Sequence, residues 1–190
     1  MKELLTTAIG ALLGSATGLL VALQVWRVQR AGDFRQKQLS EFYSPLAGWV
    51  KKTRAYNTFD QRIWPEYEEV WQKLVTKYGN HIPESIEEDS KRFRKRVDYA
   101  NDQNRKLIVP LYRRMLEHFT DNYWLAEPQT RDYYQAFFEF VEIWIMQEEE
   151  VLAFELKERI RPDMKQVSAF FDHLEETLTR LQGEVSRGRT

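Results

Sequence analysis

Residues 4–26 read LLTTAIGALLGSATGLLVALQVW, a run of 23 positions without a formally charged side chain. Arg27 and Arg30 follow it at once. At 1.5 Å per residue an α-helix of this length reaches roughly 35 Å, enough to cross a hydrocarbon core of about 30 Å with some tilt. The stretch therefore predicts a membrane-spanning helix at 4–26, preceded by a short tail at 1–3.

Two other interpretations of this apolar stretch are open: a cleavable signal peptide and a helix buried in a soluble core. A signal peptide has an apolar centre of about 7–15 residues that ends in a small-residue cleavage site. Here the apolar run continues through Leu23 and Val25 to Trp26. Helices in soluble cores seldom lack charge for so long. The length of the run favours an uncleaved anchor.

The charges on either side of the stretch predict its orientation. Before it, Lys2 is offset by Glu3, whereas residues 27–38 carry four basic residues against one acidic residue. Positive charge stays on the cytoplasmic side, so we expect 27–38 to form a basic joint next to the membrane and the larger C-terminal part to be cytoplasmic. The residues expected at the membrane interface are Trp26, Arg27 and Arg30, because indole and guanidinium groups favour the headgroup region.

Small residues recur every four positions along the predicted anchor, at Gly10, Gly14, Gly18 and Ala22. Without larger side chains there, two helices approach closely enough for van der Waals contacts and weak Cα–H···O bonds. Glycine and alanine are frequent in membrane helices generally, so a single repeat would carry little weight. The tandem repeat predicts a face for association, either with a second copy or with another membrane helix.

The rest of the chain has the composition of one folded domain. Of the 190 residues, 43% are hydrophobic and 14% aromatic, with only 8 Gly and 6 Pro. The formal net charge of −1 gives no reason to expect nucleic acid as a partner, and no small-molecule substrate is evident. The absence of cysteine excludes disulfides, thiol catalysis and thiolate metal sites, and fits a reducing cytoplasm.

Periodicity predicts helices throughout this domain and no strand, since Asn-Gly and Asp-Gly hairpin signals are missing. Pro45 and Pro110 are expected to bend or break their helices. The fold class is therefore all-α, with the transmembrane helix followed by an antiparallel bundle of four to five helices over 39–182 and a flexible tail at 183–190. The expected helices are 39–50, Pro65 to Tyr78, Pro83 to beyond Leu111, 130–161 and Pro162 to Val185.

The last of these helices has apolar residues at alternating steps of three and four, from Met164 to Val185. Such a heptad seam fits either packing onto the bundle or a separate oligomerisation zipper. Three heptads are short for a free-standing coiled coil, so packing onto the bundle is the favoured interpretation.

The domain contains none of the common phosphate-binding or nucleophile motifs, such as G-x-x-x-x-G-K-[ST], G-x-G-x-x-G or G-x-S-x-G. No histidine has a glutamate three residues before it, as helical di-metal sites require. We expect His118 and His173 at the surface or at helix ends. The acidic run Glu148 to Glu150 lacks a calcium-loop pattern and is expected to be solvated. The sequence thus predicts no catalytic residue, no metal ligand and no cofactor.

A basic block stands in the middle of the chain, at Lys91, Arg92, Arg94, Lys95 and Arg96. It could bind lipid headgroups or another phosphate-bearing partner, each basic residue near an anionic surface contributing about 1 kcal/mol. It could also be a solvated helix face balanced by the acidic residues 87–89. We favour the solvated face.

The segment LSEFYSPL at 39–46 lies shortly after the single predicted anchor. It loosely resembles a pattern found in uncharacterised bacterial single-pass membrane proteins with a helical cytoplasmic domain. The resemblance covers eight residues; it implies a bacterial inner-membrane setting and a helical fold, and no activity or site residue.

Together these features favour a non-enzymatic, membrane-anchored helical interaction or scaffold protein, whose partners are the bilayer and a protein or a second copy. The alternative is a membrane-acting effector or toxin that oligomerises through the glycine face and permeabilises the bilayer. An enzyme with scattered carboxylates is a third hypothesis, which one sequence cannot exclude.

Overall fold

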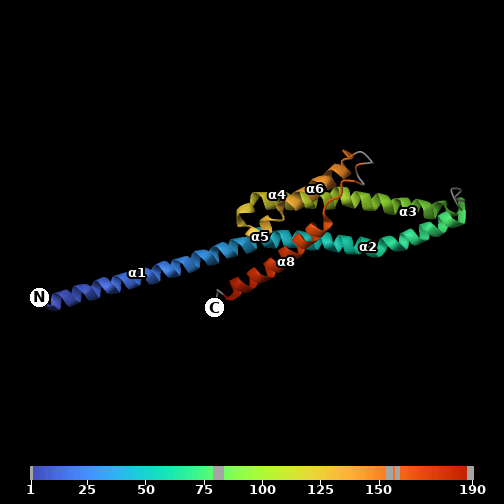
Figure 1. The fold of residues 1–190 in the computed structure, drawn as a ribbon. Coiled ribbons are helices and arrows are strands. Elements are labelled where there is room, and N and C mark those ends of the chain that lie inside the picture. The colour runs from blue at the N-terminus through green and yellow to red at the C-terminus, as the bar shows by residue number, and fades with distance from the viewer. Residues whose placement is uncertain (1, 79–83, 153–155, 157–158, 188–190) are drawn as a thin grey trace.

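The computed structural model describes residues 2–78, 84–152, 156 and 159–187, with side chains from residue 19 onward except at 84–87, 89 and 90. All regular secondary structure in these ranges is helical. Figure 1 shows an elongated molecule in which a long N-terminal helix leaves one end of a central bundle and a pair of helices projects from the other end. The all-α fold class is confirmed, with four helices in the bundle.

One continuous helical rod forms the length of the molecule. It consists of α1 (Lys2–Lys37), the π-helical segment η1 (Gln38–Tyr43) and α2 (Ser44–Tyr78), which follow one another without a gap. The joint expected at 27–38 is therefore helical, and Gly32 lies inside α1. The helix start expected at Pro65 is wrong, because this exposed proline lies inside α2.

A second rod returns beside α2 and consists of α3 (Glu84–Gln103), the π-helical segment η2 (Asn104–Ile108) and α4 (Val109–Asp121). A short connection follows, with the 3₁₀ turn η3 (Tyr123–Leu125) and α5 (Pro128–Arg131). The remaining two long helices are α6 (Tyr134–Glu148) and α8 (Met164–Arg187).

Two prolines that were expected to break helices each follow a π-helical segment instead. The Ser44 N–H donates to the Leu39 carbonyl just before Pro45, and the Val109 N–H donates to the Asn104 carbonyl just before Pro110. In a regular α-helix a proline ring clashes with the carbonyl four residues earlier and lacks its own N–H. The wider turn before each proline gives the ring room, so both rods continue.

Two expected boundaries in the C-terminal part differ from the structure. The helix expected over 130–161 ends at Glu148, and Glu150 has a φ of 56°, in the left-handed region that ends helices. The flexible tail expected at 183–190 is wrong for residues 183–187, because α8 continues through Gly183 to Arg187. Residues 188–190 lie outside the described part of the chain.

The core lies where η1, α4, α6 and α8 meet. Its largest fully buried side chains are aromatic: Tyr43, Phe42, Phe119, Phe137, Phe140 and Phe170. The last helix contributes a buried face, which confirms the expected packing onto the bundle, whereas Met164 at its start is 56% exposed. The buried residues of α8 are Val167, Phe170, Phe171, Leu174, Thr177 and Leu181.

Among the residues whose side chains are described, no helix combines the length and the hydropathy needed to cross a membrane. The predicted span at 4–26 begins in the part of α1 whose side chains are outside the description. The same holds for Gly10, Gly14 and Gly18, so the association face also lies largely outside it.

The burial of Phe119 leads to a prediction about stability. Its ring lies 5.3 Å from that of Phe42 and 5.5 Å from that of Phe170, between centroids. Phe119→Ala is expected to lower the free energy of unfolding by about 3–5 kcal/mol through lost contacts and a cavity. Urea unfolding of the full chain in mild detergent, followed by near-UV circular dichroism, measures it.

The matched control is Phe138→Ala, because Phe138 on α6 is 39% exposed. We expect a change within about 0.5 kcal/mol for this surface position. Equal losses for the two variants would contradict the position of the core.

Candidate functional site at the junction of the arm and the bundle

A buried chain of hydrogen bonds ties the π-helical segment η1 to α5 and α8. The Tyr43 hydroxyl accepts a hydrogen bond from the Glu127 N–H at 3.0 Å. Its oxygen also lies 2.7 Å from Thr130 Oγ1, which in turn lies 2.8 Å from His173 Nε2. Because the Glu127 N–H can only donate, the simplest pattern has Tyr43 donating to Thr130 and Thr130 donating to His173. This pattern requires a neutral imidazole.

The environment of His173 favours the neutral imidazole. Burial lowers its pKa, and this effect outweighs the carboxylates of Glu127 and Glu176, which act in the opposite direction. Burial also raises the pKa of the Tyr43 phenol, so its hydroxyl keeps its proton at neutral pH. The hydrogen-bonded side chains of Tyr43, Thr130 and His173 are therefore all uncharged at neutral pH.

Both histidines are partly buried. His118 lies in the last turn of α4, at a helix end as expected, whereas His173 lies inside α8, so the expected position is wrong for His173. His118 lies with its ring perpendicular to that of Trp49, at 5.1 Å between centroids. Burial lowers the pKa of His118 as well. Neither position could be recognised from local sequence, because the covering residues come from other helices.

An ion pair at the edge of this network connects the loop before α5 with α8. Arg180 donates from one terminal nitrogen to both carboxylate oxygens of Glu127, at 2.6 and 2.5 Å. Its other terminal nitrogen lies 2.8 Å from Glu184 Oε1. The pair is partly exposed, so its contribution to stability is modest.

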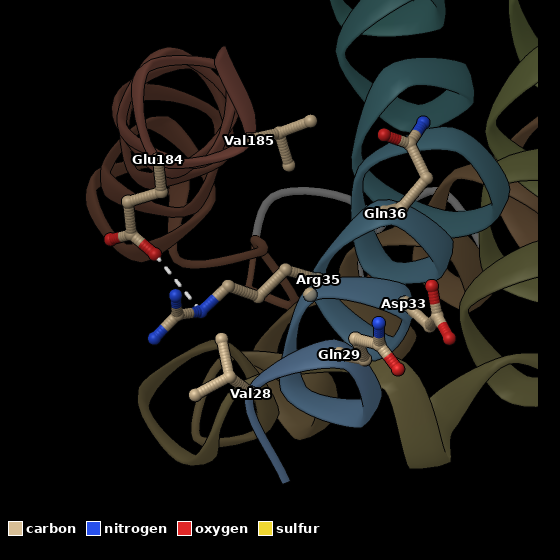
Figure 2. A pocket seen from close by; sticks show the side chains of 8 residues that line it. Val28, Gln29, Asp33, Arg35, Gln36, Glu184 and Val185 are labelled. Carbon is tan, nitrogen blue, oxygen red and sulfur yellow. Dashed lines mark ion pairs between the residues drawn. The ribbon is translucent and has the colours of Figure 1, made fainter. Parts of the chain in front are cut away.

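A groove of about 360 Å³ lies between α1 and the C-terminal part of α8. Figure 2 shows Val28 and Arg35 on one wall and Glu184 and Val185 on the other. Arg35 Nε lies 3.2 Å from Glu184 Oε2 across the groove. Gly32 also lines the groove, and a Cβ there would meet nothing within 4 Å. The groove thus lies at the junction of the long arm and the bundle.

The residues expected at the membrane interface, Trp26, Arg27 and Arg30, are exposed on the arm of α1. Ala22 of the predicted association face is exposed as well. The guanidinium carbon of Arg30 lies 4.1 Å from the centroid of the Trp26 ring, a cation–π contact between residues four apart on one helix face.

The basic block on α3 does not form one surface. Arg96 turns toward α2, where it pairs with Asp60. Its guanidinium carbon lies 5.8 Å from the ring centroids of Tyr67 on α2 and of Tyr99 on α3. Only 9% of its side chain is exposed. Lys91, Arg94 and Lys95 are exposed, and Arg92 lies beside an apolar groove described next.

An exposed apolar groove of about 280 Å³ lies between α2 and α3 and was not predicted from the sequence. Trp71 stacks on Phe93 at its base, with 4.6 Å between ring centroids and 9° between planes. Val70 on its wall is 55% exposed. The spacing of Tyr67, Val70, Trp71 and Leu74 predicts a helix face that packs against a partner, and in the structure α3 covers only part of that face.

Within the described side chains, no three residues of the types His, Cys, Asp and Glu gather closely enough to hold a metal ion. Comparison of the chain with protein families, with curated proteins and with solved structures gives no match.

The hydrogen-bond chain predicts that stability depends on pH. The pKa of His173 in the folded state is lower than its ordinary value near 6.5, so the folded state binds fewer protons than the unfolded state. The stabilisation is complete above the unfolded pKa and is lost as the pH falls through the folded pKa. The urea midpoint of the full chain should therefore decrease as the pH is lowered from 8 to 5.

His173→Gln is expected to reduce this pH dependence, because glutamine does not titrate. Part of the dependence should remain, since burial also lowers the pKa of His118. An unchanged pH dependence in the variant would show that the Thr130–His173 hydrogen bond does not require a neutral imidazole.

Proposed function

We propose that this chain is a non-enzymatic, membrane-anchored helical interaction or scaffold protein. In this proposal residues 4–26 cross a membrane and the bundle lies on the cytoplasmic side. The resemblance of residues 39–46 favours a bacterial inner membrane. The glycine line of the anchor adds association with a second copy or with another membrane helix.

The observation that carries the proposal is the continuity of the rod. α1 begins at Lys2 and runs directly into η1, so the predicted anchor and the core share one helix. From Leu19 to Val28 the large apolar side chains of this arm are 44–67% exposed, and Figure 1 shows the arm projecting away from the bundle. A bilayer around the arm would remove this apolar surface from water.

The opposite end of the molecule supports the interaction part of the proposal. The hairpin of α2 and α3 projects from the bundle, away from the arm, and carries the groove lined by Trp71 and Phe93. An exposed apolar groove rimmed by charged residues is typical of a protein-binding surface. Glu66 and Arg92 supply charges at this rim. The expectation that the protein is not an enzyme stays a prediction.

Alkaline carbonate treatment of the membrane fraction tests the anchor. The full-length protein should stay with the membranes, because carbonate removes peripheral proteins and leaves integrated helices in place. A double variant, Leu12→Arg with Leu13→Arg, should be released, since each arginine near the middle of a span costs about 2.5–3.5 kcal/mol on the insertion scale. Release of the unaltered protein would contradict the anchor.

The glycine line makes a separate prediction. Gly14→Leu should shift the protein toward smaller species in mild detergent, because the added side chain fills the space where two backbones approach. The matched control is Ala16→Leu, which adds the same bulk about half a turn away from the glycine line. Size-exclusion chromatography with light scattering measures both variants, and an equal effect of the two would remove this face from the proposal.

A further inference from the structure

An aromatic patch lies where the arm joins the bundle, and the network described above does not use it. Phe34 on α1 and Trp124 on η3 are 41% and 53% exposed, and their ring centroids are 6.1 Å apart. Tyr123, beside Trp124, is 40% exposed. Two segments ninety residues apart in sequence thus bring two exposed aromatic rings together. Tyr123 adds a third exposed ring on the same turn, packed against Phe119 and Tyr134. Isolated exposed apolar residues would need no explanation.

The turn that carries two of these rings is held firmly. Arg131 donates from Nε to the Ala126 carbonyl at 2.9 Å and from a terminal nitrogen to the Trp124 carbonyl at 3.2 Å. Its guanidinium carbon also lies 5.2 Å from the centroid of the Tyr123 ring. Beneath the turn, Gln38 donates to the buried Leu125 carbonyl at 2.7 Å. The exposed rings therefore stand on a fixed backbone.

The turn faces the side of the bundle from which α1 departs. In Figure 1 the end of α4 and the short α5 lie beside the point where the arm leaves the bundle, opposite the hairpin of α2 and α3. Phe34 is eight residues from Trp26, or about 12 Å along the helix axis. Side chains of a helix lean toward its N-terminus, which brings the Phe34 ring closer to the predicted span.

These distances bring the Phe34 ring close to the outer edge of the headgroup layer of a bilayer. The polar region adds about 5–8 Å on each side of the hydrocarbon core. With Trp26 at the core boundary, the backbone of Phe34 lies just outside this layer, and its ring, which leans toward the N-terminus, approaches the outer edge. Aromatic and arginine side chains are favoured at this depth. Segments 26–38 and 121–131 together contain five basic residues and three acidic ones. Of these, Glu127 is paired with Arg180 and Arg35 with Glu184, so the basic residues remain in excess.

We propose that Phe34, Tyr123 and Trp124, together with the neighbouring arginines, form a second membrane contact that rests on the anionic phospholipid headgroups around the anchor. This inference rests on the proposed function, because it requires residues 4–26 to span the bilayer. It adds that the bundle lies against the membrane surface and is held there by the η3 turn.

Site-specific fluorescence quenching in the full-length protein tests the contact. The chain has no cysteine, so Trp124→Cys provides a single attachment site for a nitrobenzoxadiazole fluorophore. Gln72→Cys, on the exposed side of α2 in the distant hairpin, is the matched control. Both labelled proteins are placed in nanodiscs that contain phosphatidylglycerol and a phosphatidylcholine with a spin label on its headgroup.

The expected result is loss of most of the fluorescence at position 124 and little loss at position 72. Replacing phosphatidylglycerol by phosphatidylcholine should weaken the quenching at 124, because the basic residues lose their anionic partners. Equal quenching at the two positions, or no dependence on phosphatidylglycerol, would overturn the contact with anionic headgroups.

Integration of the same samples is measured by flotation after carbonate treatment, which separates the two proposals. Protein that floats while position 124 is not quenched would overturn the headgroup contact and leave the anchor in place. Protein that does not float would overturn both the anchor and the contact that rests on it.

Discussion

The π-helical segment η1 is the constraint on which the rest of the bundle depends. Phe42 and Tyr43, which are consecutive on this segment, are both fully buried, and Gln38 is buried as well. Phe42 packs against Phe119 of α4, and Tyr43 reaches Thr130 of α5. The position of the bundle relative to the arm is therefore set within six residues.

Polar groups inside the bundle make this arrangement specific. Apolar contacts alone tolerate many packings of similar volume, whereas a buried donor or acceptor without a partner costs about 1–3 kcal/mol. Gln38, Tyr43 and Thr130 find their partners only when η1, the η3 turn and α8 have their observed positions. The network thus selects one arrangement of helices, and its simplest hydrogen-bond pattern uses a neutral His173.

Much of the helical content follows from sequence periodicity, and the departures have identifiable causes. The buried positions Val167, Leu174 and Leu181 on α8 lie at the expected heptad spacing. The continuation through Pro45 and Pro110 was not predictable, because a π turn has no clear sequence signal and was needed to make room for each ring. Pro65 and Gln61 are exposed, so the Gln61 carbonyl, which the proline leaves without an N–H donor, can turn toward water and α2 continues.

In the candidate sites, contacts within one helix could be predicted from the sequence, whereas contacts between distant segments could not. The contact of Trp26 with Arg30 joins residues four apart, a spacing that periodicity reveals. The pairings of Phe34 with Trp124 and of Thr130 with His173 depend on how distant segments fold together. Similarly, nothing in the run from Lys91 to Arg96 distinguishes the one arginine that Asp60 draws inward.

The unbroken helix from Lys2 to Tyr78 has a mechanical consequence. The part from Trp26 to Tyr78 would be roughly 80 Å long at 1.5 Å per residue, and no loop in it absorbs a change of direction. A membrane helix adjusts its tilt when the bilayer becomes thinner or thicker. With the proposed anchor in place, a change in tilt of about 10° at the membrane would move the far end of α2 by roughly 14 Å at this rise per residue. Bilayer thickness would thus be converted into displacement of the groove between α2 and α3.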